Sequence, residues 1–349
     1  MPLAAIPTML ERAVLAQHPA RRSDAASISR ASFADIDEQA AALAGWNQHY
    51  VQLSAGRFRG EVRRRQLPGI GLFIEDLQQS VRQTGHVARG MVALGVPLLL
   101  RGDARFCGQA SSETHLHVFS GDDGFEFRSP QRHAMLGIEI DAALFASRVA
   151  GPAQIDATAF VREARLRCID GAALHTLRQC LYTLLAAPPR LAATQGTAIA
   201  SRLLRDAVLD RLSQALAHMA TAVPPTVACV PSRAVLIEQA QSWVRDRLDL
   251  PPTVAELCEQ LGVSRRTLQT SFHDAWGMGP LAWLRTLRLN AVRRALKTAP
   301  SVTAAATQLG FWHFGRFSHD YQVLFGELPS HTFRRHHERA QARSQHGAA

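Results

Sequence analysis

An internal repeat in the last third of the sequence constrains the fold more than any other feature. Two segments, residues 254–261 and 302–309, place apolar side chains at i, i+3, i+4 and i+7, and a glycine follows each segment. The segments are 48 positions apart, but beyond the glycines the apolar and aromatic positions match at an offset of 49, as Trp276 and Phe325 do. This pattern predicts two copies of a helix, a glycine turn and a second helix, with one additional residue in the second turn.

The second helix of the first copy is expected to have one apolar and one polar face. Ser264 can cap this helix through its hydroxyl, and Leu268 and Phe272 are expected to point into the core. The opposite face carries side chains that can bond phosphates or base edges: Arg265, Arg266, Thr267, Gln269, Thr270 and His273. Arginine can bond guanine through two atoms, and glutamine can do so with adenine. The sequence therefore predicts a helix that lies in the major groove of DNA.

The second copy presents a different set of side chains at the matching positions: His313, Phe314, Arg316, Ser318, His319 and Gln322. This set is poorer in side chains that read bases, so the first copy is expected to make most direct base contacts. The second copy is expected to supply phosphate contacts and apolar contacts to thymine methyl groups. A single helix-turn-helix pattern arises often by chance, whereas two matched copies are a much stronger indication of DNA binding.

Residues 280–297 connect the two copies and are expected to form one helix that begins at Pro280. The roughly 17 residues after the proline span about 25 Å as a helix. If the two recognition helices lie about 34 Å apart, both can enter successive major grooves on one face of the duplex. Four arginines of the connecting helix either contact phosphates or lie in solvent: Arg285, Arg288, Arg293 and Arg294.

The residues before the repeat alternate between segments typical of strands and segments typical of turns. Strands are expected at 57–66, 69–77, 115–120 and 133–140, and the pattern is helical from about residue 141, with a long helix at 198–217. Leucines at helix spacing could form a dimer interface or an intramolecular core: Leu174, Leu177, Leu181, Leu184 and Leu185. The expected fold is α+β, with a β-rich N-terminal sandwich or barrel and following helices. An all-α domain of two helix-turn-helix subdomains joined by a long helix comes after it.

Three prolines mark the expected boundary between the two parts. The uncharged segment 219–232 contains Pro224, Pro225 and Pro231 and is expected to be a linker, because proline cannot continue a helix. The expected domains are a sensing or dimerisation domain at 1–218, β-rich to about 140 and helical over 141–218, and a double helix-turn-helix domain at 233–335. Residues 336–349 are expected to form a frayed polar tail.

The charge distribution favours a nucleic-acid partner. The formal net charge is +10, and nearly all of the positive charge is arginine because Lys297 is the single lysine. Residues 221–349 contain 15 Lys and Arg against 9 Asp and Glu, so the part with the repeat is the more basic per residue. No apolar run reaches the roughly 18 residues of a membrane span, and no signal peptide opens the chain. A cytoplasmic protein without a membrane partner is therefore expected.

The cysteines and histidines offer little for catalysis. The five cysteines form no C-x-x-C pair, and reduced, mostly buried thiols are expected: Cys107, Cys168, Cys180, Cys229 and Cys258. His115 and His117 stand two apart on an expected strand, and with Glu113 or Glu126 they resemble the ligands of metal-binding barrels, although ordinary surface or core-edge histidines are the favoured interpretation. We predict no metal site, no catalytic residue and no enzyme. The alternative is a metal-dependent barrel enzyme fused to a DNA-binding module.

Three stretches within residues 234–335 resemble the DNA-binding domain of the AraC/XylS family of bacterial transcription regulators. They are "TVAELCEQLGVSRRTLQTSFHDAWGMGP", "LRLNAVRRAL" and "AATQLGFWHFGRFSHDYQVLFGELPS". The resemblance implies two helix-turn-helix subdomains joined by a helix, and an N-terminal domain that senses an effector or dimerises. It also implies an activator of a catabolic operon, with double-stranded DNA and RNA polymerase as partners.

Several stretches resemble family members that activate an ethanolamine-utilisation operon. They are "VSRRTLQTSFH", "GPLAWLRTLRLNAVRR", "GFWHFGRFSHDYQ" and, near the N-terminus, "WNQHYVQLSAGRFRGE" at 46–61. By resemblance only, these stretches imply a response to ethanolamine and adenosylcobalamin. Composition and spacing indicate neither an amine site nor a corrinoid site. The residues themselves predict a small-molecule effector of unknown identity, and they leave open whether the chain forms a homodimer.

Overall fold

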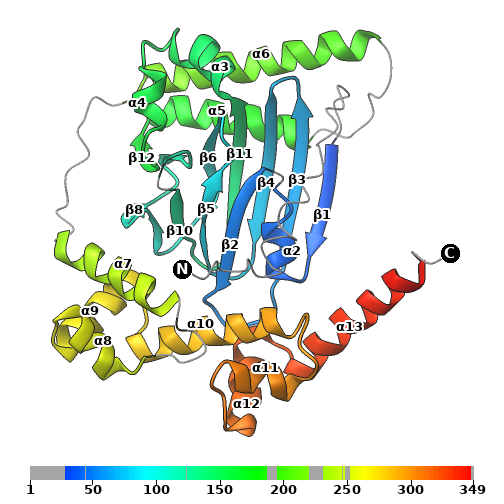
Figure 1. Cartoon of the computed structure of the whole chain (residues 1–349). Helices are drawn as coiled ribbons and strands as arrows, with labels where there is room; N and C mark the ends of the chain where they lie inside the picture. The colour runs from blue at the N-terminus through cyan, green and yellow to red at the C-terminus, as the bar shows by residue number, and fades with distance from the viewer. Residues whose placement is uncertain are drawn as a thin grey trace, which may run out of the picture.

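The computed structural model of the chain describes residues 28–43, 45–122, 124–186, 195–219, 231–245, 247 and 252–346. Strands and helices up to residue 219 form an N-terminal part, and helices from residue 231 onward form a helical part (Figure 1). The two parts lie against each other, with the long helix α10 (Pro280–Ala295) running beneath the ends of the strands.

The N-terminal part contains two antiparallel sheets. The larger sheet has the order β1 (Ile28–Phe33), β3 (Gly60–Leu67), β4 (Ile70–Leu77), β11 (His133–Asp141), β6 (Met91–Leu100), β9 (His115–Val118) and β12 (Arg165–Cys168). The smaller sheet has the order β2 (Trp46–Gln52), β5 (Val81–Val87), β10 (Phe125–Arg128), β7 (Ala104–Phe106) and β8 (Gln109–Ser111). Within the described residues the fold is thus a sandwich of two separate sheets and not a closed barrel.

Aromatic side chains fill the space between the two sheets. Phe106 and Phe127 of the smaller sheet pack with Phe119 and with Met135 of β11 in one buried cluster. Side chains alternate along a strand, so the neighbours of Met135 on β11 point to the opposite face of the larger sheet. Leu136 and its alternating partners are fully buried there against helices.

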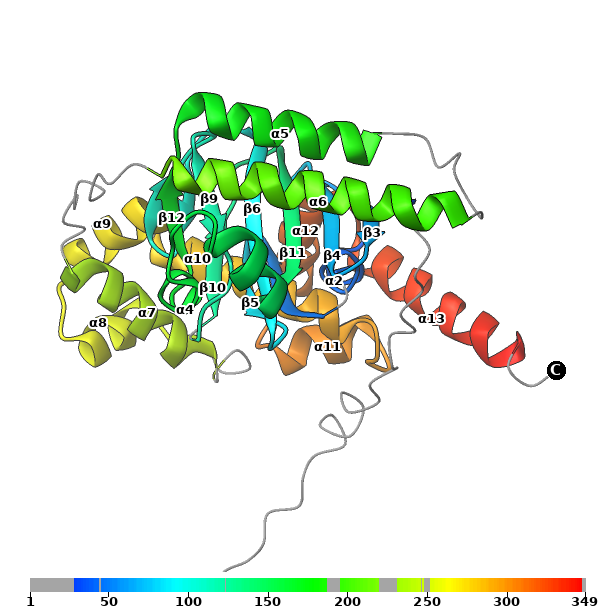
Figure 2. The same ribbon diagram turned by 90° about the horizontal axis from the view of Figure 1, so that it is seen from above.

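Two long helices cover that outer face of the larger sheet. α5 (Gly171–Ala186) and α6 (Gln195–Ala217) run side by side over the strands (Figure 2), together with the short helices α3 (Ala142–Phe145), η1 (Ala146–Ala150) and α4 (Ala157–Val161). For five leucines the sequence allowed either a dimer interface or an intramolecular core. Four of them are at most 2% exposed and belong to this core: Leu174, Leu177, Leu181 and Leu185. Their burial within the chain assigns them to the intramolecular core.

The helical part contains the predicted repeat. The first copy is α8 (Val254–Leu261) and α9 (Arg265–Trp276), and the second is α11 (Val302–Gln308) and α12 (Phe314–Phe325). α7 (Pro231–Arg245) precedes the first copy, and α13 (Pro329–His346) follows the second. The predicted connecting helix is present as α10, which begins at Pro280 as expected and ends two residues earlier than predicted.

The structure differs from the sequence-based expectations in three places. The four expected strands are present as β3, β4, β9 and β11. The other strands of the two sheets were not expected, and one of them, β12, interrupts a region predicted to be helical. Residues 336–346 continue α13 and do not form a frayed tail. Most of the expected linker, residues 220–230, lies outside the described residues, and Pro231 already begins α7.

Candidate nucleic-acid interface

The first copy is built from local signals that the sequence provides. Thr253 and Glu256 form a reciprocal capping box at the start of α8, which satisfies two backbone donors of the helix. The helix ends at Gly262 with φ of 62°, a left-handed conformation that glycine adopts without strain. Ser264 then caps α9 by accepting a hydrogen bond from the backbone N of Thr267 over 3.1 Å. These caps fix where the recognition helix begins.

α9 has the two faces that the sequence predicted. Leu268, Phe272 and Trp276 are buried in a cluster with Trp283 of α10. All six predicted contact residues are exposed on the other side: Arg265, Arg266, Thr267, Gln269, Thr270 and His273. The six side chains are therefore brought together on one accessible face, and their contact with DNA remains a prediction.

α12 repeats this arrangement with different chemistry. Phe317, Tyr321, Leu324 and Phe325 are buried. Five predicted contact residues are exposed and one, Ser318, is half-buried; the exposed ones are His313, Phe314, Arg316, His319 and Gln322. His313 stands at the cap position of α12 but makes no capping hydrogen bond with its side chain. The start of α12 thus lacks the side-chain cap that Ser264 provides to α9.

The four arginines of the connecting helix have partners within the chain, which the sequence did not indicate, and contact of any of them with phosphates stays a prediction. Arg285 forms an ion pair with Asp320. Arg288 donates to the backbone oxygen of Leu309 over 2.7 Å. Arg293 is 3% exposed, and Arg294 contacts residues of the N-terminal part. These side chains hold the two copies and the N-terminal part together.

A pair of amide side chains joins the N-terminal part to α10. The backbone N of Gln52 donates to Oδ1 of Asn290 over 2.9 Å, and Nδ2 of Asn290 donates back to the oxygen of Gln52 over 3.0 Å. The side chain of Gln52 also donates to the backbone oxygen of Leu324 in α12 over 2.8 Å. Each of these groups is buried, so breaking one bond leaves an unpaired polar atom. The end of β2 is thereby tied both to the connector and to the second copy.

The short helix α2 (Ile36–Ala40) contacts the C-terminal end of α10, and Lys297 just beyond it, through its acidic N-terminus. Nζ of Lys297 lies 2.7 Å from Oδ1 of Asp35 and 2.6 Å from Oδ2 of Asp37. Arg294 donates to Asp37 over 3.2 Å and to the backbone oxygen of Tyr50 over 2.8 Å. We call these four side chains, Asp35, Asp37, Arg294 and Lys297, the acidic clasp. Sequence reasoning missed it, because its members are more than 250 residues apart.

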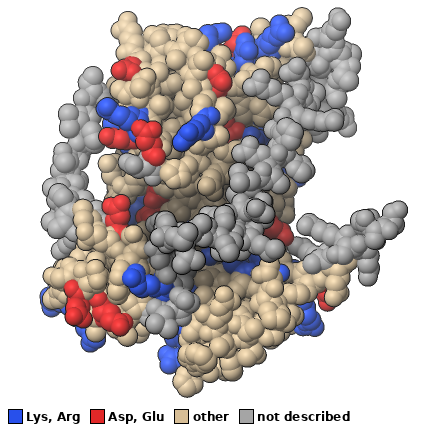
Figure 3. All heavy atoms as spheres, viewed as in Figure 1, with Lys and Arg blue, Asp and Glu red and all other residues tan. Residues whose placement is uncertain are grey.

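The first copy also contacts the N-terminal part. The guanidinium of Arg82 in β5 lies 5.5 Å from the centre of the Trp276 ring and donates to Gln241 of α7. Val51 and Leu53 pack into the same apolar cluster as Trp276. The N-terminal part thus touches both copies of the repeat as well as the connector. On the face drawn in Figure 3, Lys and Arg side chains are spread over both parts with Asp and Glu among them, and they do not gather into one patch.

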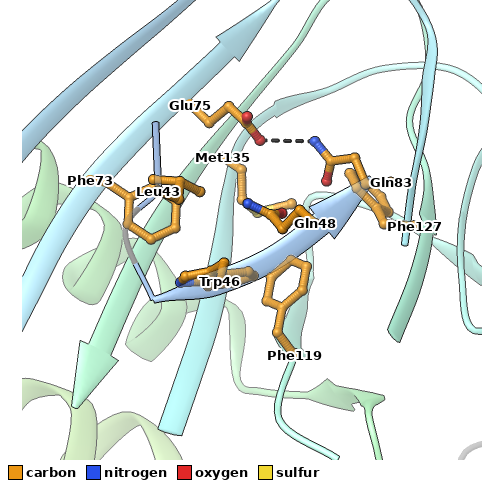
Figure 4. Close-up of a pocket in the computed structure, with 9 residues that line it drawn as sticks. All are labelled: Leu43, Trp46, Gln48, Phe73, Glu75, Gln83, Phe119, Phe127 and Met135. Carbon is orange, nitrogen blue, oxygen red and sulfur yellow. Dashed lines mark hydrogen bonds between the residues drawn. The ribbon is translucent and has the colours of Figure 1, made fainter. Parts of the chain in front are cut away.

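A narrow cavity lies between the two sheets of the N-terminal part (Figure 4). Its lining residues are Leu43, Trp46, Gln48, Phe73, Glu75, Gln83, Phe119, Phe127 and Met135. Glu75 is buried and accepts hydrogen bonds from Gln39, Tyr50 and Gln83 over 3.1, 2.9 and 2.9 Å. Burial raises the pKa of Glu75 despite these bonds, and no ion pair to it is found among the described residues. The neighbouring buried acid Glu139 differs, because Arg64 neutralises it.

Two further features of the cavity bear on what it can hold. The Nε2 atom of Gln48 is buried without a hydrogen-bond partner and belongs to a cavity-lining side chain. Gln39 connects the cavity to the acidic clasp, because α2 carries Gln39 at one end and Asp35 as its N-terminal cap. A change at Glu75 can therefore reach α10 through a helix of five residues.

His115 and His117 are placed differently from metal ligands. His117 is fully buried among Phe106, Phe119 and Phe127 and shares a hydrogen bond of 2.8 Å with Ser111. Burial and the neighbouring His115 lower the pKa of His117 to about 3. No group of three His, Cys, Asp or Glu side chains within the described part of the chain is arranged to hold a metal ion.

The cysteines correct a second expectation. Cys107 and Cys168 are exposed, and Cys180 and Cys258 are half-buried, so the thiols among the described residues are not mostly buried as predicted. All four are free, and Cys229 lies outside the described residues. None of the helices that the structure describes is both long and apolar enough to cross a bilayer.

The family model and the curated relatives match the helical part. Residues 257–335 match the family model described as a helix-turn-helix domain. A XylDLEGF operon transcriptional activator of Pseudomonas putida is 35% identical over 102 residues, which is 28% of this chain and 31% of that protein. A probable thc operon regulatory protein of Rhodococcus erythropolis is 32% identical over 108 residues, 30% of this chain and 32% of that protein. The aligned region thus spans about a third of the length of these curated relatives.

Two solved structures are also similar to parts of this chain. A probable AraC family transcriptional regulator from Rhodopseudomonas palustris is 31% identical and covers 29% of this chain and 97% of its own, with a TM-score of 0.28. The AraC-like transcriptional activator CuxR is 14% identical over 80% of this chain and 99% of its own, with a TM-score of 0.39. The family model and the relatives that are more than 30% identical together identify residues 257–335 as a helix-turn-helix domain of the AraC/XylS family of transcriptional regulators.

Proposed function

We propose that this chain is a sequence-specific DNA-binding transcription regulator that binds operator DNA with both copies of its repeat. The observation that carries the proposal is the pair of exposed helix faces on α9 and α12, each held on a buried core and joined by one helix. α10 contains 16 residues and spans about 24 Å. A helix of this length, with a recognition helix beyond each end, suits two docking sites in successive major grooves.

Activation of transcription is the most specific form of the proposal. The Pseudomonas putida relatives are named as transcriptional activators of an operon, which supports the same role here. We expect RNA polymerase to be a partner, and a homodimer is compatible with the proposal. Activation of an ethanolamine-utilisation operon is a narrower prediction that rests on sequence resemblance alone.

We also infer that the N-terminal part regulates DNA binding in response to a small molecule. Its contacts with α7, α10 and α12 support this inference, since a ligand that alters the sandwich would act on both copies of the repeat. The cavity at Glu75 is the candidate site. This cavity is narrow, so the lining side chains must move before a ligand larger than water can bind. Adenosylcobalamin is far too large for it.

Footprinting and affinity measurements with the full chain test DNA binding. Duplexes selected from a random pool should show protection in two successive major-groove segments. Their affinity should fall about a thousandfold between 50 and 200 mM salt if 6 to 10 phosphates are contacted. Protection of one groove segment only, or an affinity that does not change with salt, would contradict the proposal.

Alanine substitutions separate the roles of the two copies. We expect Arg266→Ala to relax base specificity by about tenfold, because an arginine contact to guanine is lost. Phe314→Ala should weaken binding with a smaller loss of base discrimination. Both side chains are exposed, so thermal unfolding should be unchanged in each variant. Equal losses of specificity in the two variants would contradict the predicted asymmetry.

A further inference from the structure

The turn of the second copy contains one residue that the first copy lacks, and backbone hydrogen bonds identify it. At the start of the first turn, the backbone N of Val263 donates to the oxygen of Cys258 over 3.0 Å. In the second turn, the backbone N of Phe311 donates to the oxygen of Ala306 over 3.0 Å. Each bond joins residues five positions apart, and its donor directly follows the glycine of its turn. Val263 and Phe311 are therefore structurally equivalent.

The helices that follow fix the other side of the alignment. In the first copy the backbone N of Leu268 donates to the oxygen of Ser264 over 3.0 Å, and in the second the backbone N of Phe317 donates to the oxygen of His313 over 2.9 Å. Ser264 and His313 are therefore equivalent cap positions. Val263 and Ser264 are adjacent, whereas one residue separates Phe311 from His313, and that residue is Trp312.

Trp312 is exposed at the beginning of the second recognition helix. Its exposed fraction is 70%, whereas Trp276 and Trp283 in the helical part are 4% and 0% exposed. Phe314, two residues later, is 43% exposed, and both aromatic side chains lie at the N-terminal end of α12. Two exposed large apolar side chains so close together in the sequence suggest a surface that contacts another molecule. The N-terminal end of a recognition helix is the end that meets base edges in helix-turn-helix domains.

The backbone beneath Trp312 is held rigidly. Arg288 of α10 donates to the oxygen of Leu309 over 2.7 Å and to the oxygen of Gly310 over 2.6 Å. Its guanidinium also lies 4.3 Å from the centre of the Phe311 ring. The residue before Trp312 is thus clamped against the connector. A turn whose backbone is already fixed loses little backbone conformational entropy on binding.

We propose that Trp312 determines base specificity in the second half of the operator by contacting the C5-methyl group of a thymine in the major groove. The inference rests on the proposed function of the chain as a DNA-binding regulator and adds a residue that the matched helix positions do not include. Indole lacks the paired donor and acceptor groups needed to read purines bidentately, while its apolar surface complements a methyl group. Phe314, two residues later, is a second exposed apolar side chain at this end of α12.

Replacement of thymine by deoxyuridine tests the contact, because it removes only the C5-methyl group. The full chain selects a high-affinity duplex from a random pool, and each thymine of that duplex is then replaced singly. We expect one or two replacements within the half-site bound by α12 to lower the affinity of the wild-type chain about fourfold. This is the effect of leaving one methyl-sized apolar group in water. Trp312→Ala should bind the thymine duplex about fourfold more weakly and should not discriminate thymine from deoxyuridine at those positions.

Two variants serve as controls. Trp312→Phe keeps an aromatic surface and should retain part of the discrimination. Val323→Ala removes an apolar side chain that is 54% exposed nearer the C-terminal end of α12, and it should bind like the wild type. Unchanged thermal unfolding of the three variants would show that they fold. If Trp312→Ala loses affinity at the same thymine replacements as the wild type, the proposed contact of Trp312 with thymine is contradicted, while the proposal of DNA binding is not affected. If the wild-type chain selects no duplex, the proposed function and this inference both fail.

Discussion

At the scale of single residues, Glu327 shows how much of the helical part depends on buried charge. Its carboxylate lies 2.9 Å from Nη1 of Arg293 and 2.7 Å from Nη1 of Arg335, and it accepts a hydrogen bond from Thr332 over 2.9 Å. The side chains of Glu327 and Arg293 are 6% and 3% exposed. A buried pair of this kind is costly to break from one side, since the remaining charge loses its partner.

Glu327 should make the fold sensitive to acid. Burial by itself raises the pKa of Glu327, but the hydrogen bonds from Arg335 and Thr332 and the charge of Arg293 outweigh it and lower the pKa to about 2, below the usual 4.5. The ionised form therefore contributes stability that is complete above about pH 5 and is lost as the pH falls towards 2. We expect Glu327→Gln to lower the free energy of unfolding at pH 7 by about 3 kcal/mol.

Urea denaturation at several pH values measures this contribution. The free energy of unfolding of Glu327→Gln should depend less steeply on pH between about 5 and 2 than that of the wild type, because the titrating group has been removed. Glu259→Gln, which changes an exposed side chain of α8, is the control for a change in net charge. Parallel stability curves for Glu327→Gln and the wild type would contradict the assignment.

At the scale of elements, α2 links the cavity to the helical part. Gln39 donates to Glu75 at one end, and Asp35 and Asp37 bind Lys297 at the other. α2 has only five residues and is held by these contacts more than by its own hydrogen bonds. It is therefore suited to transmit small displacements between the two parts.

A double-mutant cycle tests the acidic clasp. We expect Asp37→Ala and Lys297→Ala to be non-additive in the free energy of unfolding, with a coupling energy of about 0.5 to 1 kcal/mol for this partly exposed pair. The pair Arg30 and Glu61 lies within the N-terminal part and provides a matched cycle that does not cross between the parts. Additivity at Asp37 and Lys297 would show that the two parts do not depend on this pair.

The elements differ in how far the sequence predicts them. The repeat was predictable because its apolar spacing, glycines and capping serine are all local signals, and Gly262 and Ser264 occupy the positions expected of them. β2 was missed because its inward-facing residues include Gln48, which lines the cavity and breaks the alternation of apolar and polar side chains. A short strand of this kind carries no periodic signal of its own.

The candidate site divides in the same way. Helix periodicity placed the contact residues of α9 on one face, and the structure exposes all of them. The roles of Arg288 and Arg294 were not predictable, since their partners lie 21 and more than 240 residues away in the chain. Trp312 was indicated only by the change of offset from 48 to 49, which does not tell which residue is the additional one.

At the scale of the whole molecule, the sandwich contacts α7, α10 and α12 at once, so a change in the sandwich can alter how α9 and α12 are presented. Reciprocity requires that a ligand that changes DNA affinity also binds the DNA-bound form with changed affinity. Glu75 lies at the centre of this path, because Tyr50 contacts Glu75 through its hydroxyl and Arg294 through its backbone oxygen.

A ligand screen on the full chain tests this regulation. We expect a compound from a panel of small amines, sugars, aromatic acids and corrinoids to raise the melting temperature and to change DNA affinity by at least about threefold. Glu75→Gln should abolish both effects. Glu61→Gln, the same change on β3 outside the cavity, should preserve them. A compound that acts equally on Glu75→Gln and on the wild type would show that its site is elsewhere.

The contact between Lys297 and α2 has a practical consequence. Lys297 is the single lysine of the sequence, and its ammonium group lies between two carboxylates at the junction of the two parts. Because two carboxylates hold this ammonium by hydrogen bonds, an acylating reagent reaches its nitrogen only after those contacts have opened. The rate at which an amine-directed label reaches this one side chain therefore reports how often the junction opens, with no engineered probe required.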